Sequence, residues 1–265
     1  AADALSKNFL KALRQHCKSL DPDFWLMAEL IHGDYRDWVN PEMADASTSY
    51  ELYKSSWSAF KDHNFFELSY SLNRQFGPEG LYRDLKTQFN FLDNHDVSRI
   101  ASIMLEKEQL EALYLLLYCL PGIPALYYGS EFEFEAVKTQ NDWELRPPFP
   151  LQNLLAENRS AKLRQAIRRF AALRQSSPAL QDGDCQVCHT SSELIAFTRS
   201  AHGQTALIVM NNGNAPESLG LSLPEKAGWK FRNGLAGDSE RFVSESGEFQ
   251  LALNAYEGQV WISAY

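Results

Sequence analysis

The stretch Thr87-Gln88-Phe89-Asn90-Phe91-Leu92-Asp93-Asn94-His95-Asp96 decides the fold, because an apolar run passes directly into a series of polar side chains. The stretch Phe24-Trp25-Leu26-Met27-Ala28-Glu29 has the same arrangement earlier in the chain, and helix-like segments separate the two. In a (β/α)8 barrel the catalytic residues lie where parallel strands end. The pattern therefore favours a barrel-type active site that includes Glu29 and Asp96.

Composition indicates an acidic globular protein. The 265 residues are 45% hydrophobic and carry a formal net charge of -9. Such a chain can bury the core of one large domain or two smaller ones. Binding to a phosphate backbone draws on a surplus of Lys and Arg, so no nucleic-acid partner is expected.

The sequence indicates neither membrane insertion nor secretion. No apolar run approaches the roughly 20 residues that are needed to span a bilayer. The opening Ala1-Ala2-Asp3-Ala4 has neither the charged nor the apolar region of a signal peptide. We expect no membrane partner and a cytoplasmic rather than a secreted location, a choice that a signal peptide encoded upstream would reverse.

One cysteine motif suggests a cofactor. The segment Cys185-Gln186-Val187-Cys188-His189 matches the C-x-x-C-H pattern of haem attachment, and a C-x-x-C is also half of a zinc site. The sequence has no second C-x-x-C, and the segment leads into a strand-like run rather than a haem-binding helix. A coincidental match is the favoured interpretation, and we expect no metal or other cofactor in this chain.

The pattern of the chain changes near Pro178. Before this residue, helix-like and strand-like segments alternate, which is typical of parallel β/α units. The predicted strands are residues 24–29, 49–52, 87–96 and 122–129, and the predicted helices are residues 5–17, 107–120 and 158–175, with aromatic-rich helices up to residue 74. Roughly four β/α units are half of the eight in a closed barrel.

After Pro178 the chain consists of short alternating runs that are bounded by turn residues. The predicted strands are residues 194–199, 205–210, 218–223, 249–253 and 259–264. The stretches Asn211-Asn212-Gly213-Asn214 and Glu257-Gly258 are typical of hairpin turns. Residues 178–265 are therefore predicted to form an antiparallel β-sandwich domain that packs against residues 1–177.

Three segments resemble consecutive signature regions of the α-amylase family of glycoside hydrolases, in family order. They are Met27-Ala28-Glu29-Leu30-Ile31-His32-Gly33-Asp34-Tyr35, Phe91-Leu92-Asp93-Asn94-His95-Asp96-Val97-Ser98-Arg99, and Pro121-Gly122-Ile123-Pro124-Ala125-Leu126-Tyr127-Tyr128-Gly129-Ser130-Glu131. The resemblance covers nearly the whole chain. It implies the C-terminal half of a (β/α)8 TIM barrel, with strands 5 to 8 in residues 1–177, followed by the family's C-terminal β-sandwich in residues 178–265.

The resemblance also assigns catalytic roles. Glu29 matches the family's general acid and base, Asp96 its third acid, and His95 a neighbouring donor to the same sugar. Trp25 and Met27 are expected to desolvate Glu29 and so to raise the pKa of its carboxyl group. On the residues alone, other interpretations stay open: a salt bridge for Glu29, a helix N-cap for Asp96 and a structural role for His95.

Four further residues are predicted to bind substrate: His32, Tyr35, Asp142 and Arg146. Tyr35 closely follows Glu29 in sequence, and its ring is a candidate for stacking on a glucose unit. Asp142 and Arg146 lie in the loop after the last predicted strand, where similar enzymes shape their sugar subsites. Core packing for Tyr35 and a solvated loop for the other two are the alternatives.

The family's nucleophile has no counterpart in this chain. That nucleophile is an Asp in an Arg-x-Asp pattern, which occurs nowhere in the sequence, and Ala1-Ala2-Asp3-Ala4-Leu5 resembles the segment that follows it. The resemblance implies a fragment that is inactive alone, derived from a retaining hydrolase of α-glucans or maltodextrins. Its expected partners are the substrate, the missing N-terminal half of the barrel and, through exposed strand edges, a second copy. Any calcium site would belong to the full-length protein.

Two other functions stay open. An amylase-like domain that has lost catalysis can serve as a binding or interaction module, although the joint presence of Glu29, His95 and Asp96 argues against a decayed site. An α-glucan transglycosidase or isomerase would use the same acids. Only analysis of the products separates that possibility from a hydrolase.

Overall fold

The computed structural model describes residues 2–83, 87–237 and 239–263. Its helices are α1 (Lys7–Leu20), α2 (Tyr50–Lys61), α3 (Phe66–Phe76), α4 (Ile100–Ile103), α5 (Gln109–Cys119), α6 (Leu151–Ala156), α7 (Ala161–Ser176) and α8 (Pro178–Asp182). Its strands are β1 (Met27–Ala28), β2 (Ala46–Ser47), β3 (Phe89–Asn90), β4 (Ile123–Pro124), β5 (Asp184–Thr190), β6 (Leu194–Ala201), β7 (Gln204–Asn211), β8 (Glu217–Ser222), β9 (Lys230–Asn233), β10 (Glu240–Phe242), β11 (Glu248–Leu253) and β12 (Gly258–Ser263).

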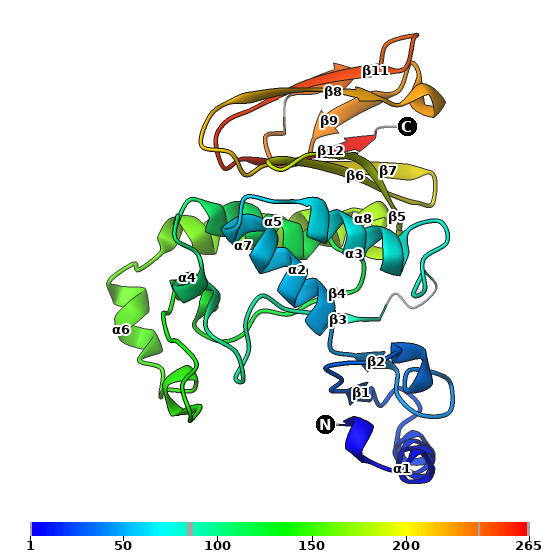
Figure 1. Cartoon of the computed structure of the whole chain (residues 1–265), viewed down its shortest axis with the longest axis vertical. Helices are drawn as coiled ribbons and strands as arrows, with labels where there is room; N and C mark the ends of the chain where they lie inside the picture. The colour runs from blue at the N-terminus through cyan, green and yellow to red at the C-terminus, as the bar shows by residue number, and fades with distance from the viewer. Residues whose placement is uncertain (1, 84–86, 238, 264–265) are drawn as a thin grey trace.

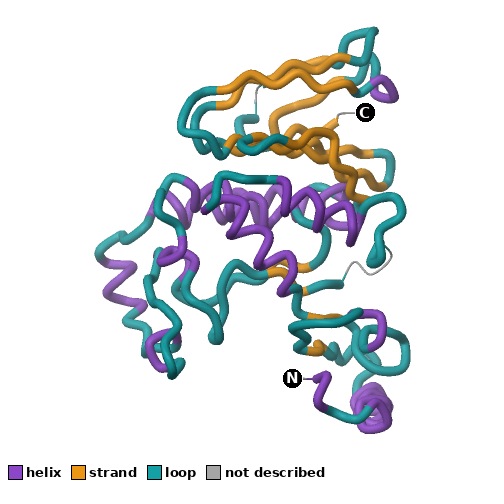
Figure 2. The backbone as a smooth tube through the Cα atoms, in the orientation of Figure 1, coloured by secondary structure: helices purple, strands orange, loops and turns teal. Residues whose placement is uncertain are grey.

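The elements are stacked in layers along the long axis of the molecule (Figure 1). The antiparallel pair β8 and β11 covers one face of a sheet with the order β10-β9-β12-β7-β6-β5. A layer of helices that includes α2, α3, α5 and α7 lies against the other face of this sheet. The short strands β1 to β4 come next, and α1 lies at the far end near the N-terminus (Figure 2).

Strands β1 to β4 form the predicted half of a (β/α)8 barrel. Strand β1 pairs in parallel with β2, and β3 pairs in parallel with β4. An isolated parallel bridge between Thr48 and Phe89 connects the two pairs. The four strands therefore follow one another in chain order, and α2 to α5 lie between them in the sequence. Their carboxyl ends point to the same end of the half-barrel, which is where side chains of the site meet.

The predicted strand at residues 49–52 is wrong. Strand β2 already ends at Ser47, and α2 begins at Tyr50. The side chains that α2 buries recur at helical spacing, with Leu52, Ser56 and Phe60 on the inner face. The 3.6-residue period of the apolar side chains therefore indicates the structure of this segment correctly, whereas the two-residue alternation in residues 49–52 does not.

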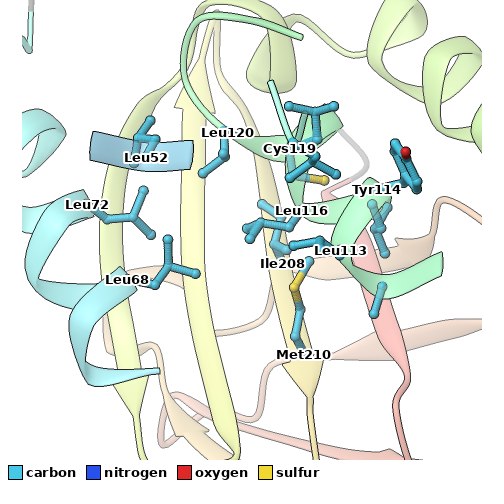
Figure 3. Close-up of a cluster of buried hydrophobic side chains, with 14 of the residues drawn as sticks. Leu52, Leu68, Leu72, Leu113, Tyr114, Leu116, Cys119, Leu120, Ile208 and Met210 are labelled. Atoms are coloured by element: carbon cyan, nitrogen blue, oxygen red, sulfur yellow. The ribbon is translucent and has the colours of Figure 1, made fainter. Parts of the chain in front are cut away.

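The helix layer and the sheet share one hydrophobic core. Helix α5 is buried on nearly all sides, which explains why its sequence is almost uniformly apolar. Leu113 and Leu116 of α5 lie beside Ile208 and Met210 of β7, and leucines of α2 and α3 belong to the same cluster (Figure 3). Residues 1–177 and 178–265 therefore pack against each other as expected.

A buried arginine ties the end of α5 to the sheet. The Arg199 side chain is fully buried, and its guanidinium donates to the carbonyl oxygens of Cys119 at 2.7 Å and Gly183 at 2.9 Å. Buried carbonyl groups at a helix end need such donors.

The C-terminal part is the predicted antiparallel sandwich. A second hydrophobic core lies between the six-stranded sheet and the pair β8–β11, and it includes Leu207, Phe249 and Trp261. Five strands were predicted here, and the structure adds β5, β9 and β10. Strand β10 exposes all three of its residues, so its sequence carries no apolar alternation.

Strand β5 contains the C-x-x-C-H motif. The Cys185 side chain is buried, and burial raises the pKa of its thiol to about 12. A protonated thiol is a poor metal ligand, because thiolate is the binding form. Cys185 is therefore a packed residue of a strand, and the absence of a zinc or haem site in this segment stays a prediction.

Helix α1 lies apart from both cores. Its N-cap is Ser6, whose hydroxyl accepts the Phe9 N–H at 3.2 Å. It contains no buried residue, and it is held by Asp45, which pairs with Arg14 at 2.7 Å and with Lys18 at 3.3 Å. Within the described ranges, no helix combines the length and the apolar character that crossing a membrane requires.

Candidate active site

The structure brings Glu29, His95 and Asp96 together. Glu29 follows β1 directly, and His95 and Asp96 lie in the loop that follows β3. One nitrogen or oxygen atom of each side chain lies within 4.8 Å of the others. The two carboxylates that the sequence placed at strand ends therefore share one site.

A cleft of about 430 Å³ opens beside this cluster. Its polar lining includes Glu29 and His95, and its apolar walls include Phe91 and Tyr127. The full lining is Met27, Glu29, Thr48, Phe89, Phe91, Asp93, Asn94, His95, Ala125, Leu126 and Tyr127. Aromatic walls with a few convergent polar groups suit a sugar, which presents both apolar faces and hydroxyl groups.

Asp96 lies at the centre of a polar network. Its Oδ1 accepts a hydrogen bond from Arg146 Nη2 at 2.7 Å, and its Oδ2 lies 3.3 Å from His95 Nε2. Arg146 also donates from Nε to the His95 carbonyl oxygen at 3.0 Å. The Asp96 side chain is 34% exposed and the His95 side chain 46% exposed, so both are accessible to a ligand.

Asp142 extends this network. It lies 3.3 Å from Arg146 Nη2 and 2.9 Å from Lys138 Nζ. The hydrogen bond from Lys138 is the main reason that the pKa of the Asp142 carboxyl lies below its ordinary value. The structure thus places both loop residues predicted from the sequence beside Asp96.

Asp96 is not a helix N-cap. Helix α4 begins at Ile100, and the carboxylate that accepts the Ile100 N–H is that of Asp93, at 2.9 Å. The N-cap residue of α4 is Arg99, and the side-chain acceptor at this helix end is Asp93. This leaves Asp96 to interact with the groups around the cleft.

Within this chain the two side chains that were expected to shield Glu29 are open to solvent, and the shielding stays a prediction. Trp25 is 45% exposed and Met27 is 40% exposed. Side chains this open to solvent do not form a dry wall around a carboxyl group. The half-barrel on its own leaves this side of the site facing water.

His32 and Tyr35 do not join the cleft. They line a separate hollow of about 510 Å³, together with Tyr50, Glu51 and Arg74 among others. The Tyr35 side chain is only 3% exposed. Its prediction as a ring that stacks on sugar is wrong, because the ring is stacked on Tyr82 with a centroid distance of 5.1 Å. Burial is also the main cause that raises the pKa of the Tyr35 phenol to about 12.

Sequence reasoning missed Tyr50 and Asn94. The Asn94 side-chain amide donates to the Tyr50 hydroxyl at 3.2 Å, and its Oδ1 accepts the Asp96 N–H at 2.8 Å. Burial is the largest cause that raises the pKa of the Tyr50 phenol, and the charges of Glu29 and Asp96 raise it further. Position was the only signal for Asn94, since it lies directly before His95; Tyr50 gave none, because it was assigned to a strand.

The cluster has limited capacity for a metal ion. Glu29, His95 and Asp96 could each offer one ligand atom. However, the Arg146 guanidinium already lies against Asp96 and would repel a divalent cation there. A network of hydrogen-bond donors and acceptors is better suited to sugar hydroxyls.

Family comparisons match both parts of the chain. The model described as "Alpha amylase, catalytic domain" matches residues 4–183, and that described as "Maltogenic Amylase, C-terminal domain" matches residues 186–260. The cyclomaltodextrinase of Geobacillus thermopakistaniensis (strain MAS1) is 23% identical over 96% of this chain and 42% of its own length. Neopullulanase 2 of Thermoactinomyces vulgaris is 25% identical over 98% of this chain and 43% of its own length. A cyclomaltodextrin glucanotransferase of Bacillus sp. (strain 38-2) is 26% identical over 83% of this chain and 30% of its own length.

Solved structures share the fold. An Anoxybacillus alpha-amylase superposes with a TM-score of 0.83 at 24% identity, over 98% of this chain and 56% of that one. The alpha-amylase from Geobacillus thermoleovorans, solved with acarbose, gives a TM-score of 0.84 at 21% identity, over 98% of this chain and 58% of that one. The chain thus spans less than half of the two first-named curated relatives and little more than half of these structures.

Proposed function

Because this chain belongs to the α-amylase family of glycoside hydrolases, we propose that the protein that carries it cleaves α-linked glucans such as maltodextrins. The observation that carries the proposal is the meeting of Glu29, His95 and Asp96 within 4.8 Å beside an aromatic-walled cleft. The names of the relatives, a cyclomaltodextrinase and a neopullulanase, support this substrate class.

In the proposed mechanism Glu29 is the general acid and base. It donates a proton to the glycosidic oxygen as the bond breaks, and its carboxylate then removes a proton from the attacking water. Glu29 lines the cleft, so its side chain can reach a bound glycosidic bond.

Asp96 and His95 hold the sugar ring in this proposal. A carboxylate accepts hydrogen bonds from two hydroxyl groups, and these bonds strengthen as positive charge develops on the ring. Arg146 fixes one oxygen of Asp96 at 2.7 Å and so sets the direction in which the other points. The loop residue Asp142, which pairs with Arg146, is proposed to bind the next sugar along the chain.

We also propose that the nucleophile comes from polypeptide outside residues 1–265. A retaining mechanism needs a second carboxylate roughly 5 Å from the acid. Asp93 also lines the cleft, but it is buried and its oxygens already accept hydrogen bonds from Ser130 and Ile100. The relatives are more than twice as long as their matched parts, which supports an external source.

The proposed binding surface for that polypeptide is the apolar surface of residues 5–27. It is formed by exposed side chains just before α1, in α1, in the segment that leads into β1 and at the start of β1, namely Leu5, Phe9, Leu20, Phe24, Trp25 and Met27. The N-terminal half of a barrel would cover this surface and continue the parallel sheet beyond β1. Self-association of two copies is the competing outcome, and sedimentation of residues 1–265 alone distinguishes it.

Replacement of Glu29 by Gln tests the function. In the complete protein, Glu29→Gln keeps the shape of the side chain but removes the proton transfer, so kcat on maltoheptaose should fall by about 10²- to 10⁴-fold. The matched control is Glu144→Gln, an exposed carboxylate in the loop that carries Arg146. Residues 1–265 alone should show no turnover above background.

Two results would contradict the proposal. An unchanged rate in Glu29→Gln would remove Glu29 from the mechanism. An inactive complete protein that still binds maltodextrin would identify a binding module instead.

Transglycosylation is a second candidate because a cyclomaltodextrin glucanotransferase is among the relatives. It would use the same three side chains with a sugar rather than water as acceptor. Chromatography of the products decides between the two: shorter glucans alone indicate hydrolysis, whereas longer or cyclic glucans indicate transfer.

A further inference from the structure

The loop that carries His95 and Asp96 is held at both ends by buried polar side chains. Residues 94–98 lie between Asp93, which is 3% exposed, and Arg99, which is fully buried. Asp93 Oδ2 accepts the N–H of Ile100 at 2.9 Å, so its carboxylate closes the loop from one end to the other. Burial of a carboxylate and a guanidinium is unfavourable unless specific partners satisfy both.

Arg99 finds its partners among backbone carbonyl groups. Its Nη1 donates to the carbonyl oxygen of Tyr128 at 2.9 Å, and its Nη2 donates to that of Leu145 at 2.8 Å. Its backbone N–H donates to the Ala136 carbonyl oxygen at 2.8 Å. One residue thereby binds the segment after β4 at three separate points.

Aromatic rings surround the same guanidinium. Its central carbon lies 4.2 Å from the ring centroid of Tyr127, 5.3 Å from that of Tyr128 and 5.1 Å from that of Phe134. These distances are typical of cation–π contacts. Tyr127 lines the cleft beside Glu29, so the buried guanidinium also supports one wall of the site.

Ser130 links the two buried charges. Its hydroxyl donates to Asp93 Oδ1 at 2.6 Å and accepts from Arg99 Nη1 at 3.4 Å. Burial raises the pKa of Asp93, and the hydrogen bonds from Ser130 and Ile100 and the charge of Arg99 oppose that rise. The three side chains therefore form one connected unit beneath the loop.

This unit connects the loop that carries Asp96 to the segment that carries Arg146. Residues 94–98 carry Asp96 itself, and Leu145, which Arg99 holds, directly precedes the Arg146 that contacts Asp96. We propose that Arg99, acting through Ser130 and Asp93, is a positioning residue that fixes Asp96 and Arg146 relative to each other. This inference rests on the proposed catalytic role of Asp96.

The planar fork of arginine is essential to this role. Two donors of one guanidinium reach two carbonyl groups in fixed directions, whereas the single ammonium of lysine acts as a point charge. Arg99→Lys should therefore keep the buried charge but lose the fixed geometry. Ser130→Ala removes only the link and is a milder test.

The matched control is Arg199, the second fully buried arginine. It also donates to backbone carbonyl groups, but it joins the end of α5 to the sandwich, at a distance in the sequence from every residue of the site. Arg199→Lys should destabilise the fold as Arg99→Lys does. It should leave the geometry around Asp96 intact.

The experiment compares Arg99→Lys, Ser130→Ala and Arg199→Lys in the complete protein. Kinetics on maltoheptaose are measured together with hydrogen–deuterium exchange of residues 94–98. A displacement of about 1 Å in a catalytic group is expected to lower the rate by about 10²-fold. Arg99→Lys should therefore lower kcat by at least about tenfold, and KM should change by a smaller factor. Exchange of the Asp96 amide, which donates to Asn94, should increase.

Ser130→Ala should show the same two changes at smaller size, and Arg199→Lys should show neither. The proposal is overturned if Arg99→Lys keeps kcat within about twofold of the parent, or if exchange in residues 94–98 stays unchanged. It is also overturned if Arg199→Lys loses as much kcat at an equal loss of melting temperature. A parent protein without turnover would refute the proposed function instead, and the exchange measurement would still test the positioning unit.

Discussion

Residues 2–31 and the C-terminal sandwich differ in the exposure of their large apolar side chains. Seven large apolar side chains are exposed in the first region: Leu5, Phe9, Leu20, Phe24, Trp25, Met27 and Ile31. Among the described residues from 178 onward, Phe242 is the one exposed side chain of this kind. The sandwich buries its apolar residues within the chain, whereas the start of the half-barrel leaves them exposed.

The strands differ in the same way. Strands β5 to β7 are 7 or 8 residues long and pair along most of their length, whereas β1 to β4 contain 2 residues each. Long antiparallel strand pairs are stabilised by their own hydrogen bonds, whereas short parallel strands depend for stability on neighbouring strands on both sides. The comparison teaches that the long strand ladders lie in the sandwich, whereas Glu29 and Asp96 follow strands of only two residues each.

The largest expected effect is in the sandwich core. Trp261 is 3% exposed and contacts Phe249 edge to face at a centroid distance of 6.0 Å. Trp261→Ala should lower the free energy of unfolding by about 3 to 5 kcal/mol, because the cavity cannot be refilled from a rigid core. Urea titration of residues 1–265 measures this change. A loss below about 1 kcal/mol would mean that the sandwich does not carry the stability assigned to it.

The next largest effect is expected at Phe9 of α1, where a substitution should weaken binding without lowering stability. Phe9 is 51% exposed, so Phe9→Ser should change the stability of residues 1–265 by less than about 0.5 kcal/mol. Binding to a separately expressed N-terminal half of the barrel should weaken by about 1.5 kcal/mol or more, because that half would bury the ring. Calorimetry of the two halves measures this loss.

The control is Phe66→Ser on α3, a phenylalanine with a similar exposure of 54%. It lies outside the apolar surface of residues 5–27 and should leave binding of the N-terminal half unchanged. Equal losses for the two variants would show that the surface has no special role.

The smallest effect concerns the polar anchor of α1. Asp45 is 19% exposed and accepts hydrogen bonds from Arg14 and from the Leu26 N–H. Burial acts to raise the pKa of its carboxyl, but the Leu26 N–H, Arg14 and Lys18 outweigh burial and hold it below 3.8. The contribution to stability is therefore complete above the unfolded pKa near 4 and is lost as the pH falls through the folded value.

Asp45→Asn should therefore destabilise the protein by about 1 kcal/mol at pH 7 and by progressively less as the pH falls below about 4. Urea titrations of parent and variant across this range give the difference. A penalty of the same size at every pH would show that the ion pairs contribute nothing and that only the hydrogen bond to Leu26 matters.

The fold and the central carboxylates could be predicted because their signals are local. An apolar run that ends in Glu29 and another that passes into His95 and Asp96 already indicate strand ends, and the structure places these three side chains together. Helix α5 and the main sandwich strands also follow their hydrophobic periods. Such patterns record burial directly, which explains why they were sufficient.

The remaining features depend on contacts between distant residues. The stacking of Tyr35 on Tyr82 joins residues 47 positions apart, so an exposed loop aromatic and a buried one look the same in sequence. Arg99 lies within a signature region, but its hydrogen bonds to the carbonyl groups of Tyr128 and Leu145 join residues 29 and 46 positions apart. Strand β5 was missed because Cys185 is the one buried residue of Asp184–Thr190, so the contact of this strand with α3 leaves no apolar alternation in the sequence.

The measurement that tests the central claim most directly is the position of a bound maltooligosaccharide. A crystal structure of the complete protein carrying Glu29→Gln, soaked with maltohexaose, should place a glycosidic oxygen within about 3 Å of the residue 29 side chain. It should also place hydroxyl groups of the adjacent ring on Asp96 and His95. Electron density for the sugar only elsewhere, for example in the hollow between α5, α7 and the turn before β12, would contradict the assignment of the active site.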